Sequence, residues 1–388
     1  MAASHKKQVL LMMNARKFLG VISRYAFEHG WRLTLMNDGL APTGWKGDGA
    51  ILSYSRSPAQ KEFAARFAQG KIPAVALSYS QPQIKLPRVT AGFESIGRMG
   101  ARHLFERGYE TFVFCSSERL KSGEIVYRSY VDALNGLRFK GTVPSSEGTV
   151  PWIVRSDVLK AGHEFDWGRL SRYFARFIAK LKRPIGFFCQ SDASAVNVLN
   201  ACLENGLRVP EDAGILGVND NPVLCENQET TISSINPDFD RIALTACEML
   251  DRAMDGGELT DETIPIDPLG VSIRESTGLA SVNDPRLAKA TRILREHIAD
   301  SYGIAELAAE LGVSVSTLNR LFHELAGTTP AAELRRLKLE HAKTLLRGTD
   351  CTVEAIAADS GFANAAHLSN VFREVNGLTP GEWRAKWR

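Results

Sequence analysis

Two short segments near the C-terminus combine an apolar stripe at helical spacing with a polar face suited to base edges in DNA. The stripes are Leu318, Leu321, Phe322 and Leu325 in the first segment, and Leu368, Val371, Phe372 and Val375 in the second. Arg can form paired hydrogen bonds with guanine and Asn with adenine, so such faces fit a major groove. The candidate DNA-binding residues are Ser316, Thr317, Asn319 and Arg320, then His367, Ser369, Asn370 and Arg373.

The two segments belong to an internal repeat, in which residues 304–330 recur at 353–380. Gly312 corresponds to Gly361 and Leu318 to Leu368, so the offset is 49 before the turn and 50 after it. Each copy predicts a helix, a tight turn and a second helix. Gly312 stands where a left-handed residue would end the first helix, and Ser314 can cap the second. The alternative is a pair of generic helical hairpins with solvated faces.

The last hundred residues resemble the DNA-binding domain of the AraC family. The resemblance is carried by Gly361-Phe362, Phe372-Arg373, Gly377, Thr379-Pro380 and Glu382-Trp383-Arg384. It implies two helix-turn-helix units joined by a long helix at about Pro330–Leu346, which bind adjacent major-groove faces roughly 34 Å apart. The family often has longer polar residues where Ala365 and Ala366 stand, so the second unit is expected to act more through phosphates. Lys338, Lys343 and Arg373 are candidate phosphate partners, and each is equally well explained as a solvated charge.

The chain before this region alternates short apolar runs with amphipathic helical stretches, a pattern typical of βαβ units. We therefore predict a two-lobed α/β domain of doubly wound parallel sheets at 1–278, a linker at 279–284 and an all-α domain at 285–388. The expected strands are Gln8–Met13, Trp31–Met36, Ala50–Tyr54, Pro73–Ser78, Thr111–Cys115, Pro184–Cys189 and Gly214–Val218. The expected helices are Phe93–Arg107, Arg169–Lys182, Ala193–Asn205 and Arg241–Asp255.

Polar residues follow several of these runs, where open parallel sheets bind their ligands. They are Asn14, Arg16, Ser78, Ser116, Asp192, Asn219 and Asp220. Amide, carboxylate and guanidinium groups match the vicinal hydroxyls of a polyhydroxy ligand as donors and acceptors. Some of these residues could merely cap helices, and Asp192 before Ala193 is the clearest case.

This half resembles the sugar-sensing core of the LacI/GalR and periplasmic sugar-binding type. The matching stretches include Arg98 to Tyr109, Ser191 to Asp212, Ile215 to Asp220 and Thr231 to Ile235. A chain in which such a core precedes an AraC-type domain is similar in its domain order to the regulators of xylose operons. The resemblance implies a monosaccharide effector, with xylose the leading candidate, facing Arg128, Asp192 and Asn219. The chain departs from that pattern at Ala91-Gly92 and at Asn219, where carboxylates are common. The alternatives are therefore a sensor that has lost its sugar site and one that binds a ligand other than a sugar.

The expected partners are operator DNA, the effector and RNA polymerase, with the chain acting as an activator in a homodimer. The dimer and the activation follow from the resemblance alone.

The net charge of +3 is too small to indicate nucleic-acid binding by itself. The apolar run Val9–Met13 is too short for a signal peptide, and no stretch approaches the roughly 18 to 20 apolar residues of a membrane span. We therefore expect a cytoplasmic protein without a membrane role. A secreted sugar-binding protein would share the lobes but not residues 285–388.

Six scattered cysteines show no pairing or metal-binding spacing, which indicates reduced thiols and no metal site. Cys115 and Cys189 follow expected strands, so an enzymatic N-terminal domain is a remote alternative. Neither has a glycine-rich elbow or an evident activating His. No phosphate-binding glycine motif is present, and we expect no cofactor and no catalytic residue.

Overall fold

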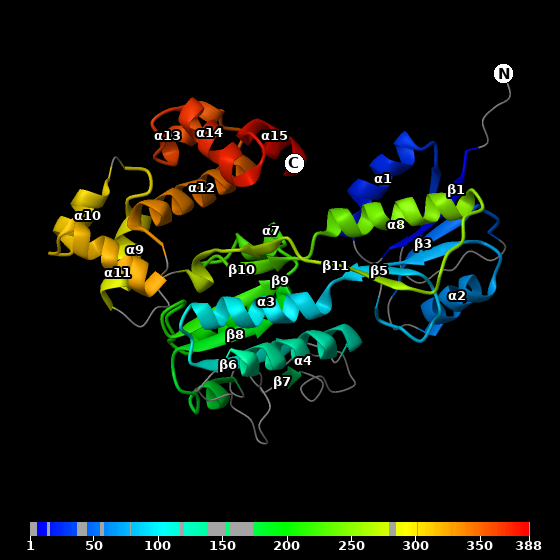
Figure 1. Ribbon diagram of the computed structural model, residues 1–388, viewed down its shortest axis with the longest axis horizontal. Coiled ribbons are helices and arrows are strands. Elements are labelled where there is room, and N and C mark those ends of the chain that lie inside the picture. The colour runs from blue at the N-terminus through cyan, green and yellow to red at the C-terminus, as the bar shows by residue number, and fades with distance from the viewer. Residues whose placement is uncertain are drawn as a thin grey trace.

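The computed structural model describes most of the chain, in several stretches. These are residues 6–13, 16–36, 45–54, 58–77, 79–116, 120–137, 152–154, 174–278, 285–300, 302–326 and 328–387. Within them, a two-lobed α/β region is followed by an all-helical region (Figure 1).

The first lobe is built on a six-stranded sheet in the order β11-β5-β4-β3-β1-β2, whose described pairings are parallel. Its inner strands are apolar on both faces because helices cover both. Helices α1 and α8 pack on one face, and α2 packs on the other (Figure 1). The bounds are β1 Gln8–Met13, η1 Arg16–Phe18, α1 Leu19–Glu28, β2 Arg32–Met36, β3 Gly49–Ser53, α2 Pro58–Gln69, β4 Ala74–Ala76, β5 Arg88–Ala91, α8 Phe239–Met254 and β11 Thr263–Ile266.

The second lobe repeats this design with the order β12-β10-β9-β8-β6-β7, in which only the edge strand β12 is antiparallel to its neighbour among the described pairs. Helices α3 and α4 cover one face, and α6 covers the other. The bounds are α3 Phe93–Glu106, β6 Thr111–Ser116, α4 Lys121–Gly136, β7 Trp152–Val154, β8 Ile185–Cys189, α6 Asp192–Glu204, β9 Ala213–Val218, α7 Pro222–Cys225, β10 Ser233–Asn236, β12 Gly270–Ser272 and η3 Glu275–Thr277.

The chain passes between the lobes three times, after β5, after β10 and after β11. The crossings are tied to one another by the backbone. Gly92 N–H donates to the Ile266 carbonyl at 2.7 Å, and Leu269 N–H donates to the Asn236 carbonyl at 2.9 Å. These short crossings connect the two lobes in the described part of the chain, and they are called the hinge below.

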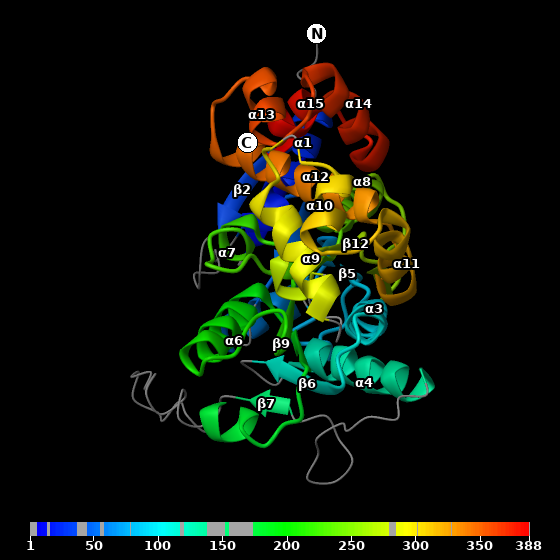
Figure 2. The same cartoon turned by 90° about the vertical axis from the view of Figure 1, so that its left-hand side faces the viewer.

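The helical region consists of two groups joined by one long helix, α12, with a separate apolar core in each group (Figures 1 and 2). Gly312 and Gly361 both adopt left-handed conformations, with φ of +67° and +68°, at the turns that the repeat predicts. The bounds are α9 Pro285–Glu296, α10 Ile304–Glu310, α11 Val315–Ala326, α12 Pro330–Gly348, α13 Val353–Asp359, α14 Ala365–Asn376 and α15 Pro380–Trp387.

The predicted fold class is confirmed, since each predicted strand overlaps an observed one. The short strands β5, β7, β10, β11 and β12 were not predicted. Of the expected helix Arg169–Lys182, residues 174–178 are helical and residues 169–173 lie outside the described part. The predicted linker 279–284 also lies outside it. Among the described residues, no helix has the length and apolar character needed to cross a bilayer.

Candidate functional site

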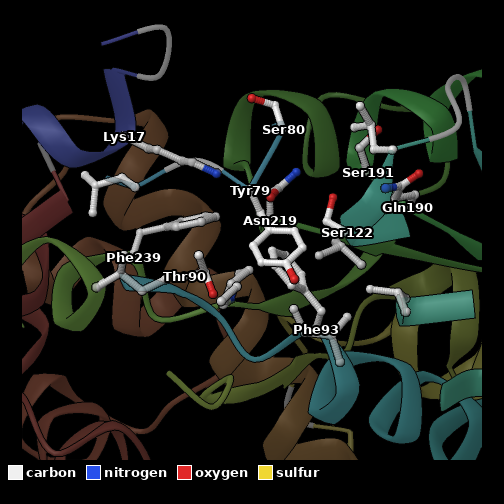
Figure 3. Close-up of a pocket in the computed structure, with 18 of the residues that line it drawn as sticks. Lys17, Tyr79, Ser80, Thr90, Phe93, Ser122, Gln190, Ser191, Asn219 and Phe239 are labelled. Carbon is white, nitrogen blue, oxygen red and sulfur yellow. The ribbon is translucent and has the colours of Figure 1, made fainter. Parts of the chain in front are cut away.

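A cavity of about 470 Å³ lies between the two lobes, at the carboxyl ends of their strands (Figure 3). Its described wall is partly aromatic and partly hydrogen-bonding. The aromatic residues are Phe18, Tyr79, Phe93 and Phe239, and the polar residues are Lys17, Ser53, Ser80, Thr90, Ser122, Gln190, Ser191 and Asn219. Flat apolar rings beside hydroxyl and amide groups suit a ligand with an apolar face and a hydroxylated edge.

Lys17 extends into this cavity from η1, the turn that follows β1 (Figure 3). Its ammonium lies 3.4 Å from the ring centroid of Phe239 and 5.3 Å from that of Phe18. The residue as a whole is exposed, yet its charged end packs against the ring of Phe239 and is largely buried there. That burial lowers the pKa of Lys17 to about 8, against the opposing effect of the Asp192 carboxylate. The ammonium is therefore charged at neutral pH.

Asn219 reaches the cavity from the loop after β9, where three successive backbone N–H groups are fixed. Asn219 N–H donates to the Ile235 carbonyl at 3.0 Å, and Asp220 N–H donates to Ser234 Oγ at 3.0 Å. Asn221 N–H donates to Asp192 Oδ2 at 2.8 Å. Asn219 has a φ of +110°, which a non-glycine residue keeps only where its surroundings impose it. This loop is therefore held in place before any ligand arrives.

Asp192 supports this loop and is not among the residues that line the cavity. It is almost fully buried, and its second oxygen accepts a hydrogen bond from Ser234 Oγ at 2.6 Å. Burial raises the pKa of Asp192 to about 6, although these two hydrogen bonds oppose the shift. The alternative that Asp192 caps its helix is wrong, because Ser191 is the N-cap and accepts from Ser194 N–H.

Asp220 also points away from the cavity lining. Its carboxylate lies 2.8 Å from the Arg274 guanidinium and accepts from Ser272 Oγ at 2.6 Å. Arg274 is buried and forms a second ion pair, with Glu226, at 2.8 Å. Burial alone would lower the pKa of Arg274, but the two carboxylates outweigh that effect and raise it. Asp220 is therefore part of a buried ion-pair network behind the loop.

The other predicted ligand-binding residues fall in different places. Asn14 and Ser78 lie outside the described residues, and Arg16 begins η1 with a side chain that is not described. Arg128 is exposed on α4 and does not line the cavity. Ser116 hydrogen-bonds the side-chain oxygen of Gln190, so it positions a lining residue. Asn219 is thus the one predicted residue in the described wall of the cavity.

Sequence reasoning missed Lys17 and the aromatic wall. Phe93 begins α3 directly after β5, and Phe239 begins α8 after β10. The rule that ligands lie at the carboxyl ends of strands would have found them if those two strands had been recognised. Lys17 follows β1 by only four residues, but the candidates predicted after that strand were Asn14 and Arg16.

Helix α11 presents the predicted polar face of the first helix-turn-helix unit. Ser316, Asn319 and Arg320 are exposed, Thr317 is half-buried, and Leu318 and Phe322 are fully buried. Ser314 caps the helix as predicted, because its Oγ accepts from Thr317 N–H at 3.1 Å. Its hydroxyl also lies 2.9 Å from that of Ser316, so the first turn carries linked hydroxyl groups.

Helix α14 presents the corresponding face of the second unit. His367, Asn370 and Arg373 are exposed and Ser369 is half-buried, while Leu368, Val371 and Phe372 are buried. The prediction that Val375 points inward is wrong: it is 57% exposed in the last turn of the helix. Asn364 caps α14 by accepting from His367 N–H at 2.8 Å.

Helix α12 joins both units and contacts the second lobe. Arg336 donates to the Ile273 carbonyl at 3.3 Å and pairs with Glu333 on its own helix at 2.7 Å. Lys338 donates to the Gly361 carbonyl at 2.7 Å and Lys343 pairs with Glu340, so two of the three candidate phosphate partners already have protein partners.

The end of the α/β region is anchored on the second lobe. Ser276 Oγ donates to the Ile215 carbonyl at 2.6 Å, and Thr277 Oγ1 donates to Ser233 Oγ at 2.7 Å. Arg107 donates to the Thr277 carbonyl at 2.6 Å. The chain therefore leaves the α/β region from a fixed point on the second lobe.

The two cysteines that could have been nucleophiles are buried. Cys115 is 4% exposed and Cys189 is fully buried, and burial raises the pKa of the Cys189 thiol well above its usual value. A thiol in such surroundings stays protonated and is a poor nucleophile.

Comparisons with known proteins agree with this geometry. A helix-turn-helix domain model matches residues 307–386, and a periplasmic binding protein-like domain model matches residues 101–277. The xylose operon regulatory protein of Escherichia coli (strain K12) is 23% identical over 350 residues, which cover 88% of this chain and 84% of that protein. The transcriptional activator RhaS of Klebsiella pneumoniae (strain 342) is 35% identical over 105 residues, 27% of this chain and 38% of that protein. A solved structure of a xylose-binding transcription activator matches with a TM-score of 0.61, at 21% identity over 99% of both chains.

The fold and these matches make the chain similar to transcription regulators in which a periplasmic binding protein-like domain precedes a helix-turn-helix domain. Within this class, the chain resembles the xylose operon regulatory proteins over most of its length.

Proposed function

We propose that this chain binds operator DNA through α11 and α14 and that a monosaccharide, held between the two lobes, controls this binding. The observation that carries the proposal is the cavity itself, in which aromatic rings face hydroxyl and amide groups beside a hinge. The names of the relatives make xylose one candidate effector and transcription activation the expected outcome. Because the chain departs from the xylose-regulator pattern at Ala91-Gly92 and Asn219, other monosaccharides are candidates as well.

Sugar binding is supported by the way the polar wall is prepared. Asn219 is fixed by its loop, and Gln190 is fixed by Ser116. Preordered side chains lose little conformational entropy when a ligand binds. The rings of Phe93 and Phe239 offer apolar surface from opposite lobes, so a ligand between them favours the closed arrangement. Differential affinity for the two arrangements is what any such switch needs.

A route from the cavity to the DNA-binding region is supported by a short series of contacts. Asn219 lines the cavity, and its neighbour Asp220 pairs with Arg274. Ile273, the residue before Arg274, accepts a hydrogen bond from Arg336 on α12. Because α12 joins both helix-turn-helix units, a shift at its sensor end changes how α11 and α14 are presented. We propose that sugar binding acts on DNA affinity through this route.

The proposed DNA-reading residues are those of the exposed faces of α11 and α14. They are Ser316, Thr317, Asn319, Arg320, His367, Ser369, Asn370 and Arg373. We further propose that the chain acts as a cytoplasmic homodimer that recruits RNA polymerase and has no catalytic activity. The buried state of Cys115 and Cys189 supports the last point.

The experiment is a thermal-shift panel of pentoses, hexoses and their acids with the full-length protein, repeated with Asn219→Gly. Glycine adopts a φ of +110° without strain, so this variant removes the amide and keeps the loop. Losing one good hydrogen bond should weaken sugar affinity about three- to tenfold. Asn227→Gly, at an exposed position outside the cavity, is the matched control. If no sugar stabilises the protein, the sensor has lost its site and the proposal fails.

A further inference from the structure

The charge balance of the cavity is one-sided. Lys17 is the one charged side chain in its described wall. No carboxylate lies within ion-pair distance of its ammonium among the described residues, and its described contacts there are the rings of Phe18 and Phe239. An ammonium over aromatic rings is stabilised by their negative faces, but the rings do not neutralise its positive charge. Among the described residues, the carboxylate that acts on this charge is that of Asp192, which forms no ion pair with it.

The described carboxylates near the cavity are hydrogen-bonded or ion-paired with other protein groups. Asp192 accepts from Asn221 and Ser234, and Asp220 pairs with Arg274. Asp238 caps α8 by accepting from Arg241 N–H, and Asp267 accepts from Ser95 at the hinge. Each is engaged with protein donors, so the described acidic side chains support the wall and do not line it.

Two helices add to the positive character of the same space. Helix α3 begins at Phe93 and α4 begins at Lys121, and their first turns line the cavity through Phe93 and Ser122. Neither helix has a side-chain hydrogen bond at its N-cap. The acidic residues of their first turns, Glu94 and Glu124, pair with Arg98 and Lys121 and do not line the cavity. The first N–H groups of a helix carry partial positive charge and favour anions. Lys17 faces this end of the cavity from the other lobe (Figure 3).

We propose that the effector is a sugar bearing a negative charge, a carboxylate or a phosphate, and that Lys17 is its counter-ion. This inference rests on the proposed sensing function and narrows its ligand class. The anionic group lies against Lys17, the sugar ring lies between Phe93 and Phe239, and the hydroxyls meet Gln190 and Asn219. A neutral pentose would bring no negative charge to the Lys17 ammonium when the lobes close around it, which disfavours closure.

The test compares matched ligands on the full-length protein by calorimetry and thermal shift. D-galacturonate and D-galactose form one pair, D-glucuronate and D-glucose a second, and D-glucose 6-phosphate separates phosphate from carboxylate. We expect at least one anion to bind at least tenfold more tightly than its neutral counterpart. Equal or tighter binding of the neutral sugars, xylose included, overturns the inference while leaving sugar sensing intact. If neither neutral nor charged sugars bind, the proposed function itself fails.

Variants of Lys17 assign the effect to this side chain. Lys17→Met keeps the length of the side chain and removes the charge, so affinity for the anion should fall at least tenfold while affinity for the neutral counterpart changes little. Lys17→Arg should restore much of the loss because it restores the charge. Lys61→Met, on the exposed face of α2, is the matched control. An anion that binds Lys17→Met as tightly as it binds the wild type contradicts the assignment.

Discussion

The carboxylate of Asp220 lies 2.8 Å from the guanidinium of Arg274, within the second lobe. Asp220 follows Asn219, which lines the cavity. Arg274 follows Ile273, whose carbonyl accepts a hydrogen bond from Arg336 on α12. The pair is therefore placed between the proposed sugar site and the helix that joins the two DNA-binding units.

Arg274→Met should destabilise the protein by about 3–5 kcal/mol, because it removes the buried guanidinium that pairs with the carboxylates of Asp220 and Glu226. The measurement is urea denaturation of the full-length protein. Arg208→Met is the control: its ion pair with Asp212 involves a side chain that is 72% exposed, and its loss should cost about 0–1 kcal/mol. Equal effects of the two substitutions would show that the buried network is not stabilising.

Arg336→Met should uncouple the sensor from the DNA-binding region. It removes the hydrogen bond to Ile273 and the pairing with Glu333, both far from the cavity wall. Sugar affinity should change little, while the ratio of DNA affinities with and without sugar should fall by about fivefold or more, within the usual range of coupling. The exposed neighbour Arg335→Met is the control. An unchanged ratio in Arg336→Met contradicts this route.

Arg320→Ala should weaken specific DNA binding by about 1–3 kcal/mol and relax the preference at one base pair. Arg320 is exposed on α11, so the fold should be preserved. Fluorescence anisotropy on a selected DNA site and its single-base variants measures both effects. Arg66→Ala, at an exposed position in the sensor, controls for the loss of one positive charge. If the base preference stays the same, Arg320 does not read DNA.

Asp192 should make stability depend on pH. Burial raises its pKa to about 6, so the folded protein binds this proton more tightly than the unfolded chain does. The resulting stability is fully present below the ordinary pKa of 3.8 and is lost as the pH rises through 6. Relative to Asp192→Asn, the wild type should lose on the order of 1–3 kcal/mol between pH 4 and pH 7. Parallel stability curves for the two proteins would show that Asp192 does not titrate in this range.

Much of the fold could be predicted because its signals are local. Buried parallel strands such as β1 and β8 are continuous apolar runs, and the repeat places Gly312 and Gly361 at equivalent turns. Short strands with polar residues carry no such local signal. Strand β10, Ser233–Asn236, has only one apolar residue and is held as a strand by its neighbours β9 and β12.

The candidate site was less predictable because side-chain direction depends on distant partners. Asp192 follows its strand as a ligand-binding residue would, yet Asn221 and Ser234, 29 and 42 residues away, hold its carboxylate. Asp220 is drawn away from the cavity by Arg274, 54 positions along the chain. Lys17 lies in the cavity wall against Phe239, 222 positions along the chain, and no local pattern indicates that.

The central claim, that a sugar controls sequence-specific DNA binding, is tested most directly by one affinity measurement. A DNA site is selected from random duplexes with the full-length protein, and its affinity is measured by anisotropy with and without the sugar that stabilises the protein best. We predict a direct-repeat site and a change in affinity of about fivefold or more. An identical affinity in the presence of a sugar shown to bind, or no enriched site at all, would contradict the claim.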